Sequence, residues 1–191
     1  THLRPEEDLK KDIACYFGMV SFMDQQIGRT LAELDRLGIA DNTLVVFTTD
    51  HGHFLGQHGL TAKAIHHYED LIRIPFIARW PGRVPAGQVS QALQNLVDCS
   101  PTFLGAAGLP VSGAMTGVNQ LPCWTGGPAA RTWSVTENHH GNRKFHLRTY
   151  VNQRYKITVY RTWQDGELFD LQEDPGEIHN RWNDPAYLEV K

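Results

Sequence analysis

The segment TLVVFTT, residues 43–49, places the strongest constraint on how this chain can fold. It is β-branched and almost continuously apolar, a pattern typical of a strand that is covered on both faces, as in a parallel sheet. Before it, apolar residues recur at helical spacing over residues 6–37, and Gly38 is a natural helix end. A long helix, a short turn at Asp41-Asn42 and a buried strand together predict an α/β domain.

The composition excludes several classes of protein. The 191 residues carry 18 basic and 21 acidic side chains, for a formal net charge of −3. This balance gives no polybasic surface, so we expect no nucleic-acid partner. The apolar runs are far too short to span a bilayer, so we expect no membrane partner. Three cysteines are too few for a disulfide scaffold, which leaves the compartment open between the cytoplasm and, in a bacterium, the periplasm or exterior.

The remaining helix and strand candidates in the first 125 residues have weaker sequence signals. IPFIARW, residues 74–80, is a second strand candidate, and residues 92–97 are a third. Ser100 followed by Pro101 predicts the start of a helix that ends near Gly108. The first helix also holds Cys15, which we expect in the core.

The pattern changes in the last third of the chain. Residues 110–130 are rich in Gly, Pro and Ser and indicate a linker or a long surface loop. After it come β-rich segments that predict an antiparallel sheet of about four strands, at 131–137, 145–151, 154–160 and 166–171. Asn152-Gln153 fits a tight hairpin. We therefore divide the chain into residues 1–125 and 126–191.

The loop TTDHGHFLGQHGLTAK, residues 48–63, concentrates the groups that can do chemistry. In an open parallel sheet, ligands lie beyond the carboxyl ends of the strands, where Asp50 and His51 should project. Carboxylate and imidazole are both good ligands for a divalent cation. Lys63 then supplies a mobile positive charge for an anionic group. In the alternative interpretation, Asp50 caps a following helix and the histidines form a solvated polar loop.

Five of the ten histidines lie between residues 51 and 67, too many for all to be metal ligands. We treat His53, His58 and His66 as candidate substrate contacts, with ordinary loop or helix positions as the alternative. His66 and His67 are expected to start a helix, and leaving-group protonation is the competing role.

Several long segments together resemble the C-terminal part of a sulfatase, within the alkaline phosphatase superfamily. The helix and strand before the family's second metal-binding pair resemble YFGMVSFMDQQIGRTLAELDRLGIADNTLVVFTTDHG, and the segment with its active-site lysine resembles LGQHGLTAK with YEDLIRIPFIARWPG. A structural helix of the family resembles LVDCSPTFLGAAGLP, and the end of its C-terminal subdomain resembles ELFDLQEDPGEIHN. The resemblance implies the C-terminal half of an alkaline-phosphatase-like parallel-sheet domain over residues 1–125. A small antiparallel-sheet subdomain over residues 126–191 would follow it.

The resemblance also implies a reaction, hydrolysis of the sulfate ester of a small molecule or carbohydrate. Asp50 and His51 match the family's ligands to one divalent cation, with calcium favoured and manganese, magnesium or zinc as alternatives. Lys63 matches the catalytic lysine that binds the sulfate oxygens.

The family's nucleophile is a formylglycine made from Cys or Ser in a C/S-x-P-S/A-R motif. The sequence C-S-P-T-F at 99–103 lacks the arginine, because Phe103 stands in its place, so Cys99 is expected to pack or cap a helix. We therefore expect the formylglycine outside this chain, in an N-terminal half carried by the same or a separate polypeptide. The chain alone should be inactive.

Other interpretations stay open. The loop fits a phosphonate monoester or phosphodiester hydrolase of the same superfamily equally well, because both reactions need similar positive charge. A non-catalytic metal-binding or assembly subunit is the alternative from another class, and the sequence is compatible with a homo-oligomer. The C-terminal subdomain is expected to contact the leaving group. The candidate residues are Glu137, Asn138, His139, His140 and Arg143. The competing interpretation is that they form an exposed hairpin loop.

Overall fold

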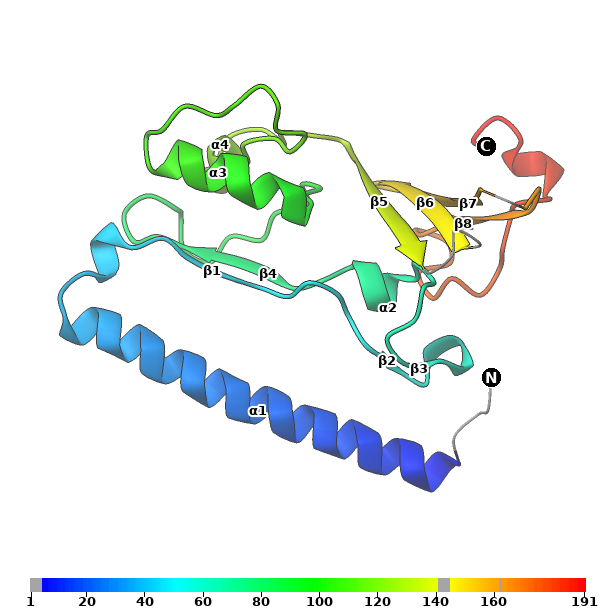
Figure 1. Cartoon of the computed structure of the whole chain (residues 1–191), viewed down its shortest axis with the longest axis horizontal. Coiled ribbons are helices and arrows are strands. Elements are labelled where there is room, and N and C mark those ends of the chain that lie inside the picture. Colours follow the sequence, from blue (N-terminus) through cyan, green and yellow to red (C-terminus); the bar gives the residue numbers. More distant parts are fainter. Residues whose placement is uncertain (1–4, 141–144, 162) are drawn as a thin grey trace.

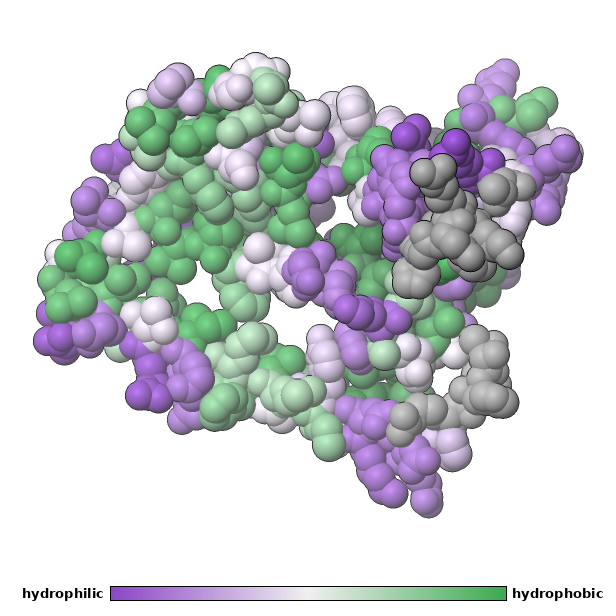
Figure 2. All heavy atoms as spheres, viewed as in Figure 1, coloured by the Kyte–Doolittle hydropathy of each residue, from purple (hydrophilic) through white to green (hydrophobic). Residues whose placement is uncertain are grey.

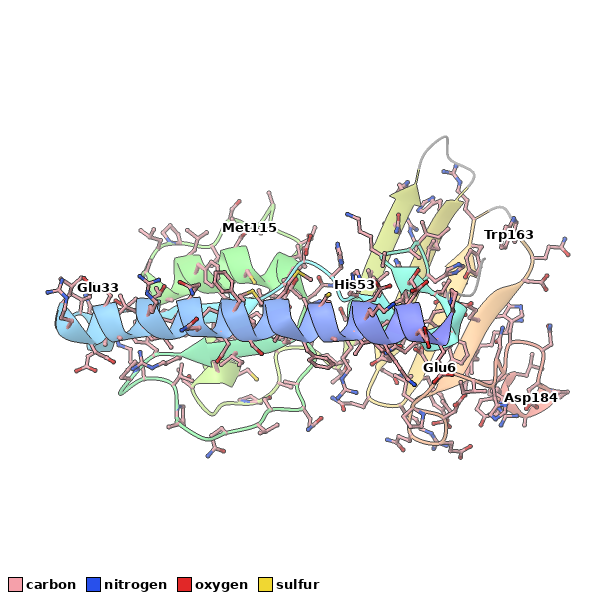
Figure 3. The ribbon with its side chains drawn as sticks, turned by 90° about the horizontal axis from the view of Figure 1, so that it is seen from below. Glu6, Glu33, His53, Met115, Trp163 and Asp184 are labelled. Atoms are coloured by element: carbon pink, nitrogen blue, oxygen red, sulfur yellow. The ribbon has the colours of Figure 1, made fainter. Side chains whose placement is uncertain are left out.

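The computed structural model describes residues 5–140, 145–161 and 163–191. Its longest element is helix α1 (Glu6–Arg36), which lies lengthwise along one face of the molecule (Figures 1 and 3). Glu6, Glu7 and Asp8 in its first turn complement the positive end of the helix dipole. The helix ends before Gly38, which adopts a φ of 67°, a left-handed conformation that glycine takes without strain.

Helix α1 is only half covered by the rest of the chain. It contains no buried residue, and Phe17 and Phe22 are 59% and 66% exposed. Figure 2 shows openings between this helix and the layer above it. Cys15 is also exposed, so its predicted place in the core is wrong. The helical spacing is right, because Leu9, Ile13 and other residues of one face are half-buried, but nothing in the described residues packs on the opposite face.

Strands β1 (Val45–Thr48) and β4 (Phe76–Arg79) form a two-stranded sheet that lies between α1 and helix α3 (Cys99–Ala106) (Figure 1). The two strands pair antiparallel, with Val46 opposite Ala78. The parallel pairing that the apolar run predicted is therefore not made between these strands. The mixed α/β architecture is as predicted. The helices within the described residues lack the combination of length and apolar character that a bilayer-spanning segment needs.

The connection from β1 to β4 carries the short elements that shape the loop. These elements are β2 (Phe54–Leu55), the 3-10 turn η2 (Gln57–Gly59), β3 (Thr61–Ala62) and helix α2 (Glu69–Ile72). The remaining short elements are η1 (Ala40–Asn42), η3 (Leu96–Asp98), α4 (Leu121–Trp124) and η4 (Pro185–Tyr187).

The predicted strand at residues 92–97 does not form. Within this segment the Leu93 carbonyl accepts from the Gln120 side chain, and just before it the Gln91 carbonyl accepts from Gln153 Nε2. Helix α3 begins at Cys99, one residue before the predicted cap Ser100. Asn95 caps the turn η3 that leads into it.

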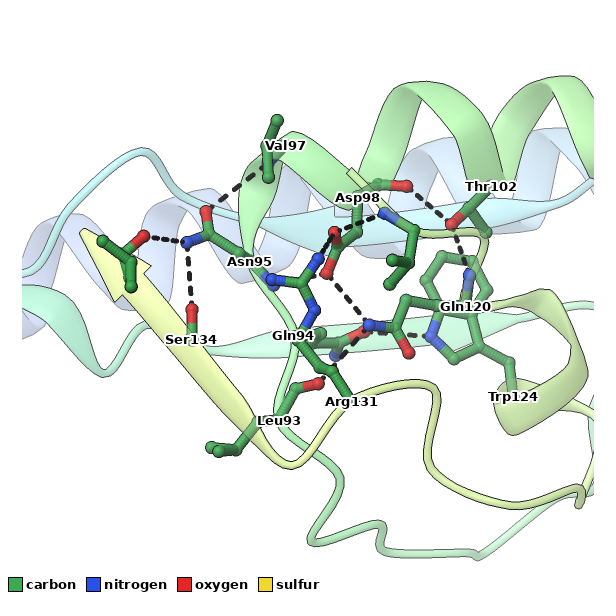
Figure 4. A network of polar contacts seen from close by, with 12 residues as sticks. Leu93, Gln94, Asn95, Val97, Asp98, Thr102, Gln120, Trp124, Arg131 and Ser134 are labelled. Carbon is green, nitrogen blue, oxygen red and sulfur yellow. Dashed lines mark hydrogen bonds and ion pairs between the residues drawn. The ribbon is translucent and has the colours of Figure 1, made fainter. Parts of the chain in front are cut away.

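A polar network around Asp98 ties this region together (Figure 4). The Asp98 carboxylate is buried and accepts from Gln120 Nε2 and the Val118 backbone N–H, both at 2.9 Å, and from Arg131. Residues 110–130 are therefore not a free linker, since Gln120 is buried and α4 lies within them. Asn95 Nδ2 extends the network to the next sheet by donating to Ser134 Oγ at 3.0 Å.

The second sheet is the predicted antiparallel meander. Its four strands lie in sequence order and are β5 (Trp133–His140), β6 (Phe145–Asn152), β7 (Tyr155–Tyr160) and β8 (Gly166–Asp170). The β6–β7 connection is a tight hairpin, with Val151 opposite Lys156. Leu147, Leu168 and Phe169 form the apolar core of this sheet.

A buried cation joins this sheet to α2. The Lys156 side chain on β7 is 1% exposed, and its Nζ lies 3.1 Å from Glu69 Oε1 and forms a second ion pair with Glu177. Glu177 Oε2 in turn accepts from the Glu69 backbone N–H at 2.6 Å. Burial raises the pKa of Glu177, and the Lys156 ammonium opposes that rise. One lysine thus holds the start of α2 and the C-terminal segment against β7.

Replacing Lys156 by methionine should destabilise the protein by about 3 kcal/mol or more, because it leaves buried carboxylates without their counter-charge. Urea denaturation of wild type and variant measures the difference. Lys10→Met is the matched control, since Lys10 is 72% exposed in its pair with Glu6 and should contribute less than about 1 kcal/mol. Equal losses in the two variants would show that the buried pair is not a structural anchor.

Candidate functional site

An open cavity of about 1250 Å³ collects the groups that the sequence singled out. It is lined by the loop after β1, by α2, by the extended segment before η3 and by β5. Asp50, His51 and Lys63 all border it, and Glu137 and Asn138 border it from β5. The fold therefore brings the three groups predicted for metal and anion binding to one cavity, although a long loop separates Lys63 from Asp50 in the sequence.

Asp50 and His51 present a converging pair of ligand atoms. His51 Nδ1 lies 2.7 Å from the Gly52 carbonyl oxygen, which can only accept, so Nδ1 carries the proton. The lone pair of the ring is then on Nε2, and Nε2 lies 3.8 Å from Asp50 Oδ2. A hydrogen bond from its own backbone N–H, followed by the neighbouring His51, keeps the pKa of Asp50 below its usual range. An ionised oxygen and an imidazole lone pair at this separation fit a divalent cation between them.

The loop that carries this pair is fixed against α2. The Gly52 backbone N–H donates to the Leu71 carbonyl oxygen at 2.7 Å. A Cβ atom at Gly52 would collide with the carbonyl of Asp70, so this position requires glycine because of the close approach of two backbones. Farther along the loop, Gly56 adopts a φ of 110°, in the left-handed region.

Lys63 is exposed at the mouth of the cavity. It follows β3 directly, and Ala62 before it has a φ of 61°, a left-handed conformation that is uncommon outside glycine. The strained turn leaves the Lys63 side chain on the cavity side of the loop, where a flexible ammonium can reach an anion.

Three other predicted histidines lie away from the cavity lining. His53 stacks on Tyr16 of α1, with ring centroids 5.3 Å apart. His58 stacks on Tyr68 at 3.8 Å, and His66 lies 5.9 Å from the same ring. Their rings make aromatic contacts that support the loop, and a role in substrate binding stays a prediction.

His67 has a structural role that the sequence did not reveal. It precedes α2, which begins at Glu69, so its predicted position at the helix start is wrong, and the same holds for His66. His67 is buried, and its Nδ1 lies 2.8 Å from Thr149 Oγ1, which contacts Thr158 Oγ1 at 2.7 Å. Burial, with Lys156 nearby, lowers the pKa of His67 to about 4, so the ring is neutral at pH 7. This chain of contacts fastens the lysine-bearing loop to the second sheet.

The β5–β6 hairpin carries the remaining candidates. His139 Nε2 lies 2.6 Å from Glu137 Oε1, and the buried His146 on β6 contacts the same oxygen at 2.5 Å. These contacts lower the pKa of Glu137 to about 2. His140 is on β5 opposite Phe145, but its side chain and Arg143 lie outside the described residues. His146 was not among the predicted site residues, because its place opposite His139 depends on the register of the β5–β6 hairpin.

Cys99, which stands in the C-S-P-T-F sequence, begins α3 and is half-buried. Burial, with the adjacent Asp98, raises the pKa of its thiol. This placement agrees with the packing role predicted for it.

Comparison with known proteins gives one consistent group. The model of the family described as Sulfatase matches residues 4–109. The N-acetylglucosamine-6-O-sulfatase of Bacteroides thetaiotaomicron is 33% identical over 183 residues, which cover 90% of this chain and 32% of that protein. A solved structure of a protein in complex with its substrate D-glucosamine-2-N,6-O-disulfate has a TM-score of 0.83 and 30% identity, and covers 90% of this chain and 36% of that one.

The phosphonate monoester hydrolase from Silicibacter pomeroyi is also similar in structure. Its TM-score is 0.88 at 27% identity, over 97% of this chain and 40% of that chain. The chain spans about a third of the length of the curated relatives it matches.

The buried His67 predicts a loss of stability in acid. Its folded-state pKa of about 4 lies below the ordinary value of 6.5, so the neutral ring stabilises the fold above pH 6.5. That contribution is lost as the pH falls from 6.5 towards 4, by about 2 kcal/mol between pH 7 and pH 5. Urea denaturation at pH 7 and pH 5 measures the free energy of unfolding. Between the two pH values it should fall less in His67→Gln than in wild type. The exposed-ring control His58→Gln should keep the wild-type loss, and an unchanged loss in His67→Gln would contradict the assignment.

Proposed function

The chain belongs to the sulfatase family, and from this premise we propose that it supplies two metal ligands and the anion-binding lysine of a sulfuric ester hydrolase. Asp50 and His51 would hold one divalent cation, with calcium favoured over manganese, magnesium or zinc. Lys63 would bind the oxygens of the sulfate group. The observation that carries the proposal is that all three groups line one cavity, with His51 Nε2 only 3.8 Å from Asp50 Oδ2.

The chemistry of sulfate-ester cleavage explains why these groups belong together. Negative charge develops on the leaving oxygen and is spread over the nonbridging oxygens as the S–O bond breaks. Asp50 and His51 would hold a divalent cation, which would supply fixed positive charge for those oxygens. Lys63 orients the anion from the other side of the loop and stabilises the developing charge electrostatically. Gly52 and the backbone contact to Leu71 keep the Asp50–His51 pair in place while the anion binds.

The rest of the enzyme would come from sequence outside this chain. We propose that the formylglycine nucleophile and the remaining metal ligands belong to an N-terminal half, on the same or a separate polypeptide. The exposed apolar side chains of α1, including Phe17, Met19 and Phe22, support this, because an apolar face of that kind is normally covered. The chain alone would then lack the nucleophile and stay inactive.

A sulfated carbohydrate is the substrate class that we favour. A similar protein is named an N-acetylglucosamine-6-O-sulfatase, and a similar solved structure holds the substrate D-glucosamine-2-N,6-O-disulfate. Glu137 and Asn138 border the cavity, at the side where the leaving group would lie. The cavity is also wide enough for a sugar, at about 1250 Å³.

Hydrolysis of phosphonate monoesters is the second candidate. The similarity to the Silicibacter pomeroyi enzyme favours it, and the same cation and ammonium suit a phosphonate oxygen. Relative turnover of an aryl sulfate and an aryl phosphonate monoester by the assembled enzyme separates the two functions. Faster hydrolysis of the phosphonate would reverse our order of preference.

Lys63→Ala should lower turnover of an aryl sulfate by about two orders of magnitude, as expected for the loss of one charge contact in the transition state. Lys63→Arg should restore activity only in part, because a planar guanidinium presents its donors differently from a compact ammonium. Steady-state kinetics of the assembled enzyme measure both, with the exposed Lys10→Ala as the matched control. Activity of Lys63→Ala within a factor of two of wild type would make this loop purely structural.

Asp50→Ala and His51→Ala should each reduce bound calcium and depress turnover while the fold persists. Both side chains lie outside β1, so their removal leaves the paired strand intact. Metal analysis after dialysis measures the bound calcium, and thermal melting checks the fold. Asp41→Ala, an exposed carboxylate in the preceding turn, is the control. Wild-type calcium content in both site variants would remove the metal assignment.

A further inference from the structure

The β5–β6 hairpin aligns three metal-ligating side chains on one face of the second sheet. His139 and His146 are directly opposite each other in the antiparallel register. Glu137 lies two residues before His139 on β5, and residues two apart in a strand project on the same side. A direct cross-strand pair brings Cβ atoms to about 5 Å, so the register itself forces the two imidazoles together.

The ligand atoms of these three side chains are close to one another. Their ligand atoms, the two Nε2 nitrogens and a Glu137 oxygen, all lie within 4.8 Å of one another. The two imidazole rings have centroids 3.6 Å apart. His139 is exposed and His146 is buried, so the cluster is anchored on one side and open to solvent on the other.

The hydrogen bonding of the cluster is crowded on a single atom. Glu137 Oε1 is in contact with the Nε2 atoms of both imidazoles, and Arg148 Nε lies 3.1 Å from the same oxygen. A carboxylate oxygen only accepts, so each of these nitrogens must carry a proton. A divalent cation could replace the two Nε2 protons if each neutral ring carries its proton on Nδ1 instead, because the lone pair is then on Nε2. The cation would bind the two Nε2 nitrogens and a Glu137 oxygen.

We propose that Glu137, His139 and His146 form a second metal site, selective for an imidazole-preferring divalent ion of the zinc class. Two imidazoles and one carboxylate suit zinc, cobalt, nickel or copper, whereas calcium prefers a full set of oxygen ligands. Three protein ligands leave a coordination position for water. The ion would cross-link β5 to β6 beside the cavity that Glu137 borders. This site is separate from Asp50 and His51 and does not depend on the proposed sulfatase activity.

Arg148 provides a further test of the assignment. Its exposed guanidinium pairs with the same Glu137 oxygen and so competes with a cation for it. Arg148→Gln should therefore strengthen zinc binding. A purely structural hydrogen-bonded cluster predicts no zinc binding in either form.

The experiment is a calorimetric titration with Zn²⁺, made in the Asp50→Ala background and with excess calcium, so that the first cation site does not contribute. One zinc ion should bind per chain. His139→Ala and Glu137→Gln should each weaken it by more than the roughly 10–100-fold that the loss of an outer-shell partner costs. His179→Ala, an exposed histidine on the C-terminal segment, is the matched control and should leave the affinity unchanged.

Thermal melting shows whether each variant is folded, and the exposed His139 is the substitution least able to disturb the fold. In the Asp50→Ala protein, zinc should raise the melting temperature, and His139→Ala should abolish that rise. Absence of zinc binding in the Asp50→Ala protein would overturn the proposal. Binding that survives His139→Ala, or that excess calcium displaces, would overturn it as well.

Discussion

The buried ammonium of Lys156 is the interaction on which the arrangement of this molecule depends. It holds Glu69 at the start of α2 and Glu177 of the C-terminal segment against β7. Helix α2 in turn holds the loop after β1, through the bond from Gly52 to the Leu71 carbonyl. The position of the Asp50–His51 pair is therefore set by a charge on a strand more than a hundred residues later in the chain.

Two further contacts make that linkage rigid. His67, which follows the lysine-bearing loop, contacts Thr149 on the second sheet, and Thr149 contacts Thr158. The Asp98 network joins the helical region to β5 through Asn95 and Ser134. Both are polar and largely buried, so leaving either partner unpaired is costly. The cavity walls consequently belong to one connected framework, although they come from both sheets (Figure 1).

Much of this fold could be predicted from local patterns in the sequence. Helical spacing located α1, and β-rich segments located the four-stranded sheet. The groups after the 43–49 run line one cavity, and their roles in metal and anion binding stay predictions. The failures have a common cause, because each depends on contacts between distant residues. The missing strand at 92–97 and the burial of His67 were both decided by partners far along the chain. The burial of Lys156 could not be predicted from its strand position either, because a lysine in a strand is normally exposed.

Gly52 has a consequence for any mutational scan of this loop. It offers no side chain to a cation or an anion, yet every substitution would drive its Cβ into the carbonyl of Asp70. Loss of function at Gly52 would therefore resemble loss of function at its neighbours Asp50 and His51, while its origin would be the spacing of two backbones. A scan that ranks positions by activity alone would count this glycine among the reacting groups, and a parallel measurement of protein abundance would separate the two causes.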